Sequence, residues 1–253
     1  MRVKLSIFLV IVAVSLVASS SASGQSTVVI LNNDGPGVGF NDTTPVAPVG
    51  GNGGTTLGQQ RMNAAQFAAN IWGATLNSGP TITIRASWEA LGCTDNTATL
   101  ASAGTISVAR NFPNAPFANT WFNGALANAL TGTDPSPNPE ISARFNINIG
   151  NAGCLDGTHW YFGFDGNEGF NNIDAISVFL HEFAHGLGFS NITNTQTGVF
   201  FNNAPSSWDR FLRDNSSGKF WIDMTAAERA ASAINNGNLV WAGPQVTAAV
   251  PGV

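Results

Sequence analysis

The chain of 253 residues carries 10 lysines and arginines against 15 aspartates and glutamates, which gives a net charge of −5 at pH 7. Without Arg2 and Lys4, which precede the expected mature start, the net charge becomes −7. An acidic chain without a basic patch is not expected to bind nucleic acid or an anionic membrane surface. We therefore expect neither as a partner of the mature protein.

Residues 1–24 have the features of a secretory signal peptide. Two cations come first, residues 5–18 form an apolar run, and residues 19–24 are mostly small. The apolar run is shorter than the stretch of about 20 residues that a membrane-spanning helix needs. We expect cleavage before Gln25, a secreted or periplasmic protein, and one mature domain over residues 25–253.

Hydrophobic periodicity predicts strands and helices through the rest of the chain. Apolar residues that alternate with polar ones indicate a strand, and apolar residues that recur every three or four positions indicate a helix. Thr55 or Thr56 is suited to cap the first helix, and Thr225 with Glu228 forms a capping-box pattern at the last one. In chain order the sequence predicts a strand over 28–31, an irregular loop over 32–54, a helix over 56–76, strands over 81–88 and 105–109, a helix over 121–130, a strand over 141–149, a strand or aromatic loop over 160–164, a helix that starts near 174 and a helix over 225–234.

The two cysteines, Cys93 and Cys154, are expected to form a disulfide. An even number of cysteines in an exported chain usually indicates a structural bridge. This bridge would close a loop of about 60 residues and stabilise the fold by roughly 4 kcal/mol in the chain-entropy model. The alternative is that a cysteine thiolate binds zinc, which requires the sulfur to lie beside the histidines.

A His-Glu-x-x-His motif is the strongest chemical signal in the chain. It places His181, Glu182 and His185 within five residues and uses two of the three histidines. On a helix, positions four apart lie one turn apart on the same face, so two imidazoles can hold one Zn²⁺. The glutamate between them is then placed to act as a general base.

The residues around the motif indicate a buried helix. Asp174 is a plausible N-cap, and Gly186 and Gly188 can end the helix because glycine adopts the left-handed conformation easily. The alternative is a core helix whose histidines only satisfy hydrogen bonds. The apolar residues that recur at helical spacing are Ile176, Phe179, Leu180, Phe183, Ala184 and Leu187.

The motif and its surroundings resemble the metzincin type of zinc endopeptidase. The signature of that clan, His-Glu-x-x-His-x-x-Gly-x-x-His/Asp, matches through Gly188, but its last position is Asn191 here. The mature chain is also similar to a family of bacterial secreted metalloprotease-like proteins. The stretches that carry this similarity are GFND (39–42), GGNGGTTLGQQR (50–61), TWFNGALANAL (120–130), ISARFN (141–146), HEFAHGLGF (181–189), SWDRFLRDNSSGKFW (207–221) and GNLVWAGPQV (237–246).

The resemblance implies an α+β catalytic domain with a twisted mixed sheet, a zinc helix and a smaller, irregular C-terminal lobe. It implies that an edge strand near residues 141–149 binds extended substrate by strand addition. Longer relatives commonly continue into a protease-associated domain, which implies that this chain is C-terminally incomplete. Metzincins also place a methionine beneath the metal, and Met224 is the candidate, although a single methionine is more often a core filler.

The third zinc ligand is open at this point. A hydrolytic zinc site needs three protein ligands and one open position. Asn191 offers only a neutral amide oxygen, whereas Asp209 offers a carboxylate and is our preferred ligand. The structural alternative for Asp209 is an ion pair or a helix cap. His159 is a further candidate, and Asp214 and Glu168 are more remote ones.

The sequence therefore predicts a secreted zinc endopeptidase that acts on a protein or peptide substrate, with Glu182 as its general base. Tyr161 could help to stabilise an oxyanion, but its aromatic neighbours favour a packing role. The main alternative is an inactive binding or adhesion module on a metalloprotease scaffold. A purely structural zinc site is less favoured, because it would need a fourth protein ligand.

Overall fold

The computed structural model describes residues 25–249. The predicted signal peptide lies outside the described residues. The described chain is α+β, with a four-stranded mixed sheet, three two-stranded pairs and five α-helices. Within it, none of the helices combines the length and hydropathy needed to span a membrane.

The main sheet has the order β1-β2-β6-β3. Strands β1 (Val28–Asn32), β2 (Ile82–Glu89) and β6 (Ile141–Asn146) run parallel, and β3 (Ala101–Thr105) closes the sheet antiparallel to β6. Alternation sets the buried face, as expected for a sheet covered on one side. The side chains that β2 and β6 bury on that face are those of Ile82, Ile84, Ala86, Trp88, Ile141, Ala143 and Phe145.

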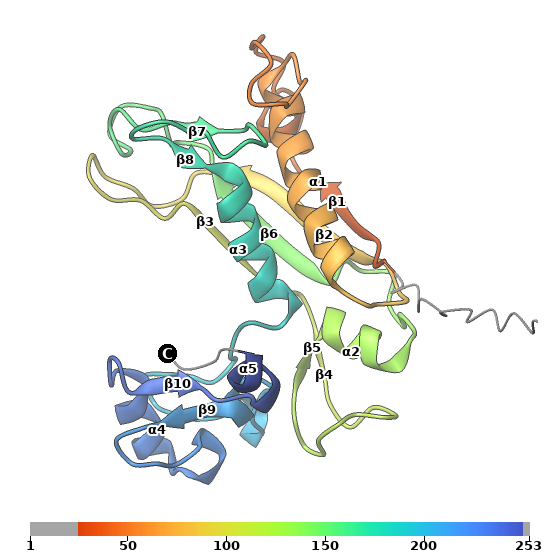
Figure 1. Ribbon diagram of the computed structural model, residues 1–253, viewed down its shortest axis with the longest axis vertical. Coiled ribbons are helices and arrows are strands. Elements are labelled where there is room, and N and C mark those ends of the chain that lie inside the picture. Colours follow the sequence, from red (N-terminus) through yellow and green to blue (C-terminus); the bar gives the residue numbers. More distant parts are fainter. Residues whose placement is uncertain (1–24, 250–253) are drawn as a thin grey trace, which may run out of the picture.

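Two helices cover this buried face side by side, α1 (Leu57–Thr75) and α3 (Ala175–Leu187) (Figure 1). The side chain of Thr56 caps α1 by accepting a hydrogen bond from the Gln59 N–H. Small residues on α1 let the layers approach closely, since Ala64, Ala65, Ala68 and Ala69 are fully buried. The helices therefore pack on the sheet with α3 against the edge strand β3 and against β6.

Two strand predictions and one helix prediction need correction. Strand β6 lies between β2 and β3, so the expectation that residues 141–149 form the edge strand is wrong. The edge is β3, which ends at Thr105, so the strand expected over 105–109 is interrupted at residues 106–107 and only its last two residues form a separate strand. The helix predicted over 121–130 begins later, because Phe122–Asn123 (β5) pairs with Val108–Ala109 (β4) before α2 (Gly124–Thr131) starts.

The C-terminal lobe, residues 188–249, lies below the sheet layer in Figure 1 and has its own small core. It holds a short pair of strands, β9 (Leu212–Asp214) and β10 (Leu239–Trp241), and the helices α4 (Ala226–Ala233) and α5 (Pro244–Ala249). The predicted capping box of Thr225 and Glu228 at α4 is confirmed. Met224 packs in this core beside Leu212 and Trp221, as a core filler would.

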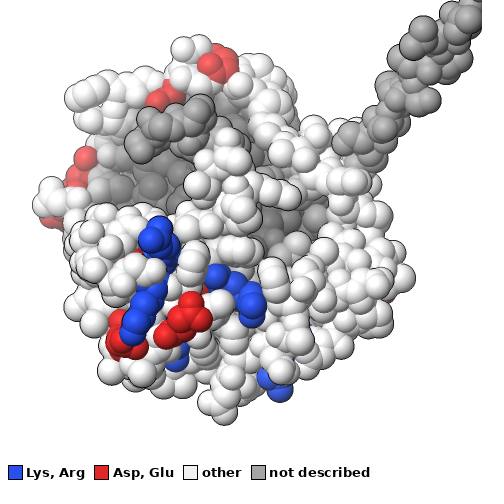
Figure 2. All heavy atoms as spheres, turned by 60° about the horizontal axis from the view of Figure 1, so that its bottom comes forward, with Lys and Arg blue, Asp and Glu red and all other residues white. Residues whose placement is uncertain are grey.

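In one region of the face shown in Figure 2 several cations lie beside anions, and further anions lie apart from them at the edge of the view. The C-terminal lobe contains one such pair, Lys219 and Glu228, with 2.6 Å between Nζ and Oε1. Both side chains are more than 40% exposed, so the pair contributes little to stability.

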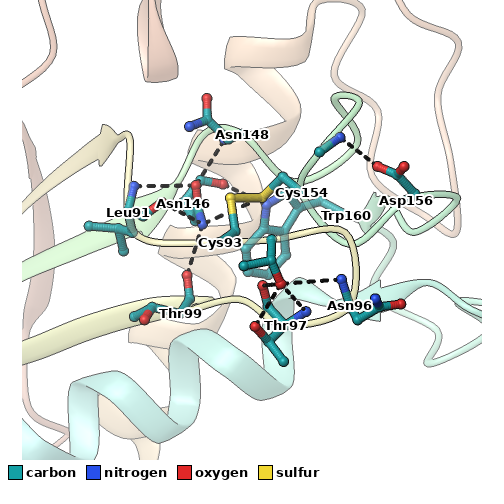
Figure 3. The surroundings of a disulfide bond; sticks show 12 residues. Leu91, Cys93, Asn96, Thr97, Thr99, Asn146, Asn148, Cys154, Asp156 and Trp160 are labelled. Atoms are coloured by element: carbon teal, nitrogen blue, oxygen red, sulfur yellow. Dashed lines mark hydrogen bonds between the residues drawn. A yellow bond between two sulfur atoms is a disulfide. The ribbon is translucent and has the colours of Figure 1, made fainter.

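The predicted disulfide between Cys93 and Cys154 is confirmed. It joins the loop after β2 to the loop after β6, and Asn146 lies beside it (Figure 3). The fully buried Asn146 side chain donates a 2.9 Å hydrogen bond from Nδ2 to the carbonyl of Thr99, just before the edge strand β3. The disulfide and this asparagine thus fix the end of β3 that lies near α3. The remaining short strands, β7 (Trp160–Tyr161) and β8 (Ile173–Asp174), pair with each other and lead into α3.

Candidate metal centre

Helix α3 begins where the sequence predicts. Asp174 is its N-cap, and the two carboxylate oxygens accept hydrogen bonds from the backbone N–H groups of Ile176 (3.2 Å) and Ser177 (3.0 Å). A side chain in this role satisfies N–H groups that have no partner within the helix. The cap fixes the start of the helix two turns before the histidines.

The two histidines of the motif converge on one point. The Nε2 atoms of His181 and His185 are 3.0 Å apart, and the rings stand almost perpendicular, with an interplanar angle of 89°. Two ligands at 2.0–2.1 Å from one tetrahedral ion would lie about 3.3 Å apart. The pair therefore fits two neighbouring corners of a zinc coordination sphere.

The backbone just beyond the helix holds the ring of His185. Its Nδ1 lies 2.9 Å from the carbonyl oxygen of Phe189. If Nδ1 carries the proton and donates to this carbonyl, Nε2 keeps a free lone pair, which a metal ligand requires. The same kind of second contact orients most metal-binding histidines.

Gly188 makes this contact possible. It has a φ of +134°, which disfavours residues with a side chain. The N–H groups of Gly188 and Phe189 bond to the carbonyls of His185 (3.3 Å) and Ala184 (3.0 Å), which is the bond pair of a Schellman motif. The turn brings the Phe189 carbonyl back beside the His185 ring.

Gly186 has a different reason to be glycine. It lies inside α3 and is buried, so it does not end the helix. A Cβ added there would lie 2.4 Å from Cγ2 of Ile141 on β6. The absence of a side chain therefore lets the last turn of α3 press against the middle of the sheet.

Glu182 lies between the histidines and is 8% exposed. It lines a cavity of about 480 Å³ together with His181. The opposite wall is formed by residues 99–101, where the chain enters the edge strand β3, and Ser177 and Val178 complete the lining. The candidate base therefore lines a space bounded by the start of the edge strand β3 and by the histidine-bearing helix.

The structure brings together His181 and His185, but not a third ligand from the expected residue types. In residues 25–249, no group of three or more His, Cys, Asp or Glu side chains could hold a metal ion. Both cysteines are in the disulfide, which removes the alternative of a thiolate ligand.

Asp209, the preferred third ligand, is fully buried in the C-terminal lobe. Its Oδ2 accepts hydrogen bonds from the hydroxyl of Thr193 and the backbone N–H of Ser206, both at 2.7 Å. Burial raises the pKa of this carboxyl, against the lowering effect of these bonds and of Arg229. Its Oδ1 is buried without a hydrogen-bond partner among the described residues. The ligand role of Asp209 stays a prediction, and the contacts show an anchoring role in the lobe.

The other candidates lie in varied surroundings. Asn191 is half-buried in the loop after Gly188. His159 is exposed, and Asp214 accepts hydrogen bonds from the N–H groups of two following serines. Glu168 lies in an exposed loop. In the described part of the chain, His159, Asp214 and Glu168 form no metal-binding group with the histidine pair.

Tyr161 is engaged elsewhere. Its hydroxyl donates a 2.6 Å hydrogen bond to Asp165, and this bond raises the pKa of Tyr161 to about 12. The oxyanion role considered for Tyr161 gains no support from this contact.

Two features of the site were not predicted from the sequence. One is the wall formed by residues 99–101, which have no chemical motif. The other is a second cavity of about 580 Å³ beside Leu187 and Phe189, at the opposite end of α3 from its cap. Trp208 and Trp241 from the C-terminal lobe line its far side. The aromatic residues of 207–221 and Trp241 were the signals in the sequence for this cavity.

No protein-family model, curated protein or solved structure matches the chain.

Proposed function

We propose that this protein is a secreted zinc-dependent endopeptidase of the metzincin type. The observation that carries the proposal is the 3.0 Å approach of the two Nε2 atoms of His181 and His185 on helix α3. Glu182 lies between them and lines the adjoining cavity. Glutamate is not needed to hold zinc beside two histidines, so its presence at this position favours catalysis.

The residues of α3 divide the chemistry among themselves. His181 and His185 would hold Zn²⁺, which when bound polarises a scissile carbonyl and makes a neighbouring water more acidic. Glu182 takes a proton from the attacking water and passes it to the nitrogen of the leaving amine. The Phe189 carbonyl keeps His185 in the tautomer that can bind metal.

The edge strand β3 is the proposed support for an extended peptide substrate. An edge strand offers unpaired backbone N–H and C=O groups on its outer side. A peptide added there by strand addition would run past the cavity that Glu182 lines. The apolar cavity beside Leu187 and Phe189 is suited to an apolar side chain of that peptide.

A second function is favoured by one observation. No third side chain of the expected types joins the histidine pair in residues 25–249. A catalytic zinc normally has three protein ligands. The alternative is an inactive module that binds protein partners at the cavity that Glu182 lines.

Metal analysis and a protease assay on the purified chain separate the two functions. The endopeptidase should contain one zinc per chain and should cleave an unfolded protein substrate. The cleavage should stop with a chelator and return with added Zn²⁺. A chain that binds substrate protein but shows no chelator-sensitive cleavage with zinc present would refute the catalytic proposal.

A further inference from the structure

Asn123 makes contacts that its position in the sequence does not suggest. It is the N-cap residue of α2, and asparagine at such a position usually caps its own helix. Here its side chain makes no capping hydrogen bond to α2. The residue is nevertheless only 2% exposed, so its amide group must find partners elsewhere.

The partners are at the end of α3. Nδ2 of Asn123 lies 3.2 Å from the carbonyl oxygen of His185 and 3.4 Å from that of Gly186. It also lies 3.3 Å from Oγ of Ser190, which itself donates a 3.0 Å hydrogen bond to the His185 carbonyl. The last carbonyls of a helix have no N–H partners within it, so donors from outside must satisfy them.

These contacts hold the turn that orients a histidine. The carbonyl of His185 and the hydroxyl of Ser190 lie on either side of the reversal at Gly188. Phe189, whose carbonyl meets Nδ1 of His185, lies inside the same reversal. A donor that binds both ends of the turn restricts the motion of the Phe189 carbonyl relative to the His185 ring.

We propose that Asn123 is a positioning residue of the metal centre. By tying the start of α2 to the end of α3, it fixes the turn whose Phe189 carbonyl sets the orientation and tautomer of His185. The inference rests on the proposed function, since it assigns Asn123 a role in the same site.

The test compares Asn123→Ala with Asn128→Ala. Asn128 is on the same helix, but its Nδ2 lies near the carboxylates of Asp134 (3.1 Å) and Glu140 (3.3 Å), so it controls for general loosening of α2. In the metal-free protein, nuclear magnetic resonance follows the Nδ1–H signal of His185 and the exchange of the Gly188 and Phe189 amides. Zinc affinity is then measured by competition with a chromophoric chelator.

Asn123→Ala should speed the exchange of both amides and broaden the His185 Nδ1–H signal. Its zinc affinity should fall about 10-fold, the lower end of the loss typical for an outer-shell partner. Asn128→Ala should leave all three readouts unchanged. Unchanged readouts in Asn123→Ala, or equal changes in both variants, would overturn the proposal.

A variant of Ser190 keeps the test usable if Asn123→Ala does not fold. Ser190→Ala removes the hydroxyl partner at the other side of the turn and should produce the same changes to a smaller extent. Unchanged readouts in a folded Ser190→Ala would then overturn the proposal. Failure of the proposed function is separate, because it would show as absent zinc binding in the wild type, while the metal-free resonance data still report on the turn.

Discussion

The two lobes hold their candidate metal ligands in different ways. In the N-terminal lobe, residues 25–187, His181 and His185 are one turn apart on a helix whose buried side packs on aromatic residues such as Phe145. In the C-terminal lobe, Asp209 is held by polar contacts to Thr193 and Ser206. The helix fixes the histidine pair over five residues, whereas any ligand from the C-terminal lobe depends on the path of the chain after Gly188.

Replacing either histidine tests the local half of this comparison most directly. We expect His181→Ala and His185→Ala each to abolish stoichiometric zinc, because one imidazole without its partner is a weak site. The fold should persist, since neither imidazole belongs to the main hydrophobic core. Elemental analysis and circular dichroism of the purified variants check the two expectations. Full zinc content in either variant would exclude this site.

Replacing the base should separate metal binding from catalysis. Glu182→Gln should keep zinc and the fold but lower peptidase activity by about 10²–10⁴-fold, the usual contribution of a general acid–base residue. The matched measurement is turnover of a peptide substrate at equal zinc occupancy. Unchanged turnover would show that another group accepts the proton.

Variants of Asp209 and Asn191 test whether the C-terminal lobe supplies a zinc ligand. Asp209→Ala should lower the free energy of unfolding by about 3 kcal/mol, because the Thr193 hydroxyl and the Ser206 N–H would be left buried without an acceptor. Thermal unfolding of the metal-free protein measures this effect without zinc.

The zinc affinities of Asp209→Ala and Asn191→Ala then decide whether Asp209 is a ligand. If Asp209 binds zinc, as the sequence predicts, Asp209→Ala should lose at least the 10–100-fold that outer-shell losses cost. Asn191→Ala should lose less. Equal affinities in the two variants would leave Asp209 with the anchoring role alone.

The smallest effect is expected at the capping box of α4. It tests whether a helix cap in the C-terminal lobe is set by local contacts, as the cap of α3 is in the N-terminal lobe. The ion contact with Lys219 and the bonds of Thr225 lower the pKa of Glu228 to about 2. Because this folded-state pKa is below the ordinary value of 4.5, the stabilisation is complete above pH 4.5 and is lost as the pH falls through about 2.

Glu228→Gln should therefore shift the urea midpoint slightly at pH 7 and less at pH 2, where the wild-type carboxylate is largely protonated. The shift should be small because the side chains of Glu228 and Lys219 are both exposed to solvent. A shift that grows as the pH falls would contradict the sign of this prediction.

Local patterns in the sequence predicted several helices and strands, and the histidine pair of the candidate site. Thr56 and Asp174 cap α1 and α3 as expected, and the bonds that do so span two or three residues. The pair of histidines follows from helical spacing alone, and the disulfide between Cys93 and Cys154 was predicted from the number of cysteines and the export signal.

The structure alone decided the features that depend on pairing between distant segments. The alternation of residues 141–149 predicted a strand, and the family resemblance implied that it lies at the edge, yet β6 lies inside the sheet, because alternation reports which face is buried and not which neighbours a strand has. Phe122–Asn123 fits a helical pattern but pairs with β4, because a tertiary hydrogen-bond ladder can outweigh local propensity.

The sequence by itself thus determined the histidine-bearing helix, its cap and its paired imidazoles, since these rest on backbone geometry within one or two turns. Only the tertiary structure decided which segment forms the wall of the cavity that Glu182 lines, where Asp209 lies and what Asn123 contacts. Each of these depends on packing between segments separated by many residues, for example 62 residues between Asn123 and His185. No local periodicity encodes such a distance, because it is set by the packing of the assembled layers.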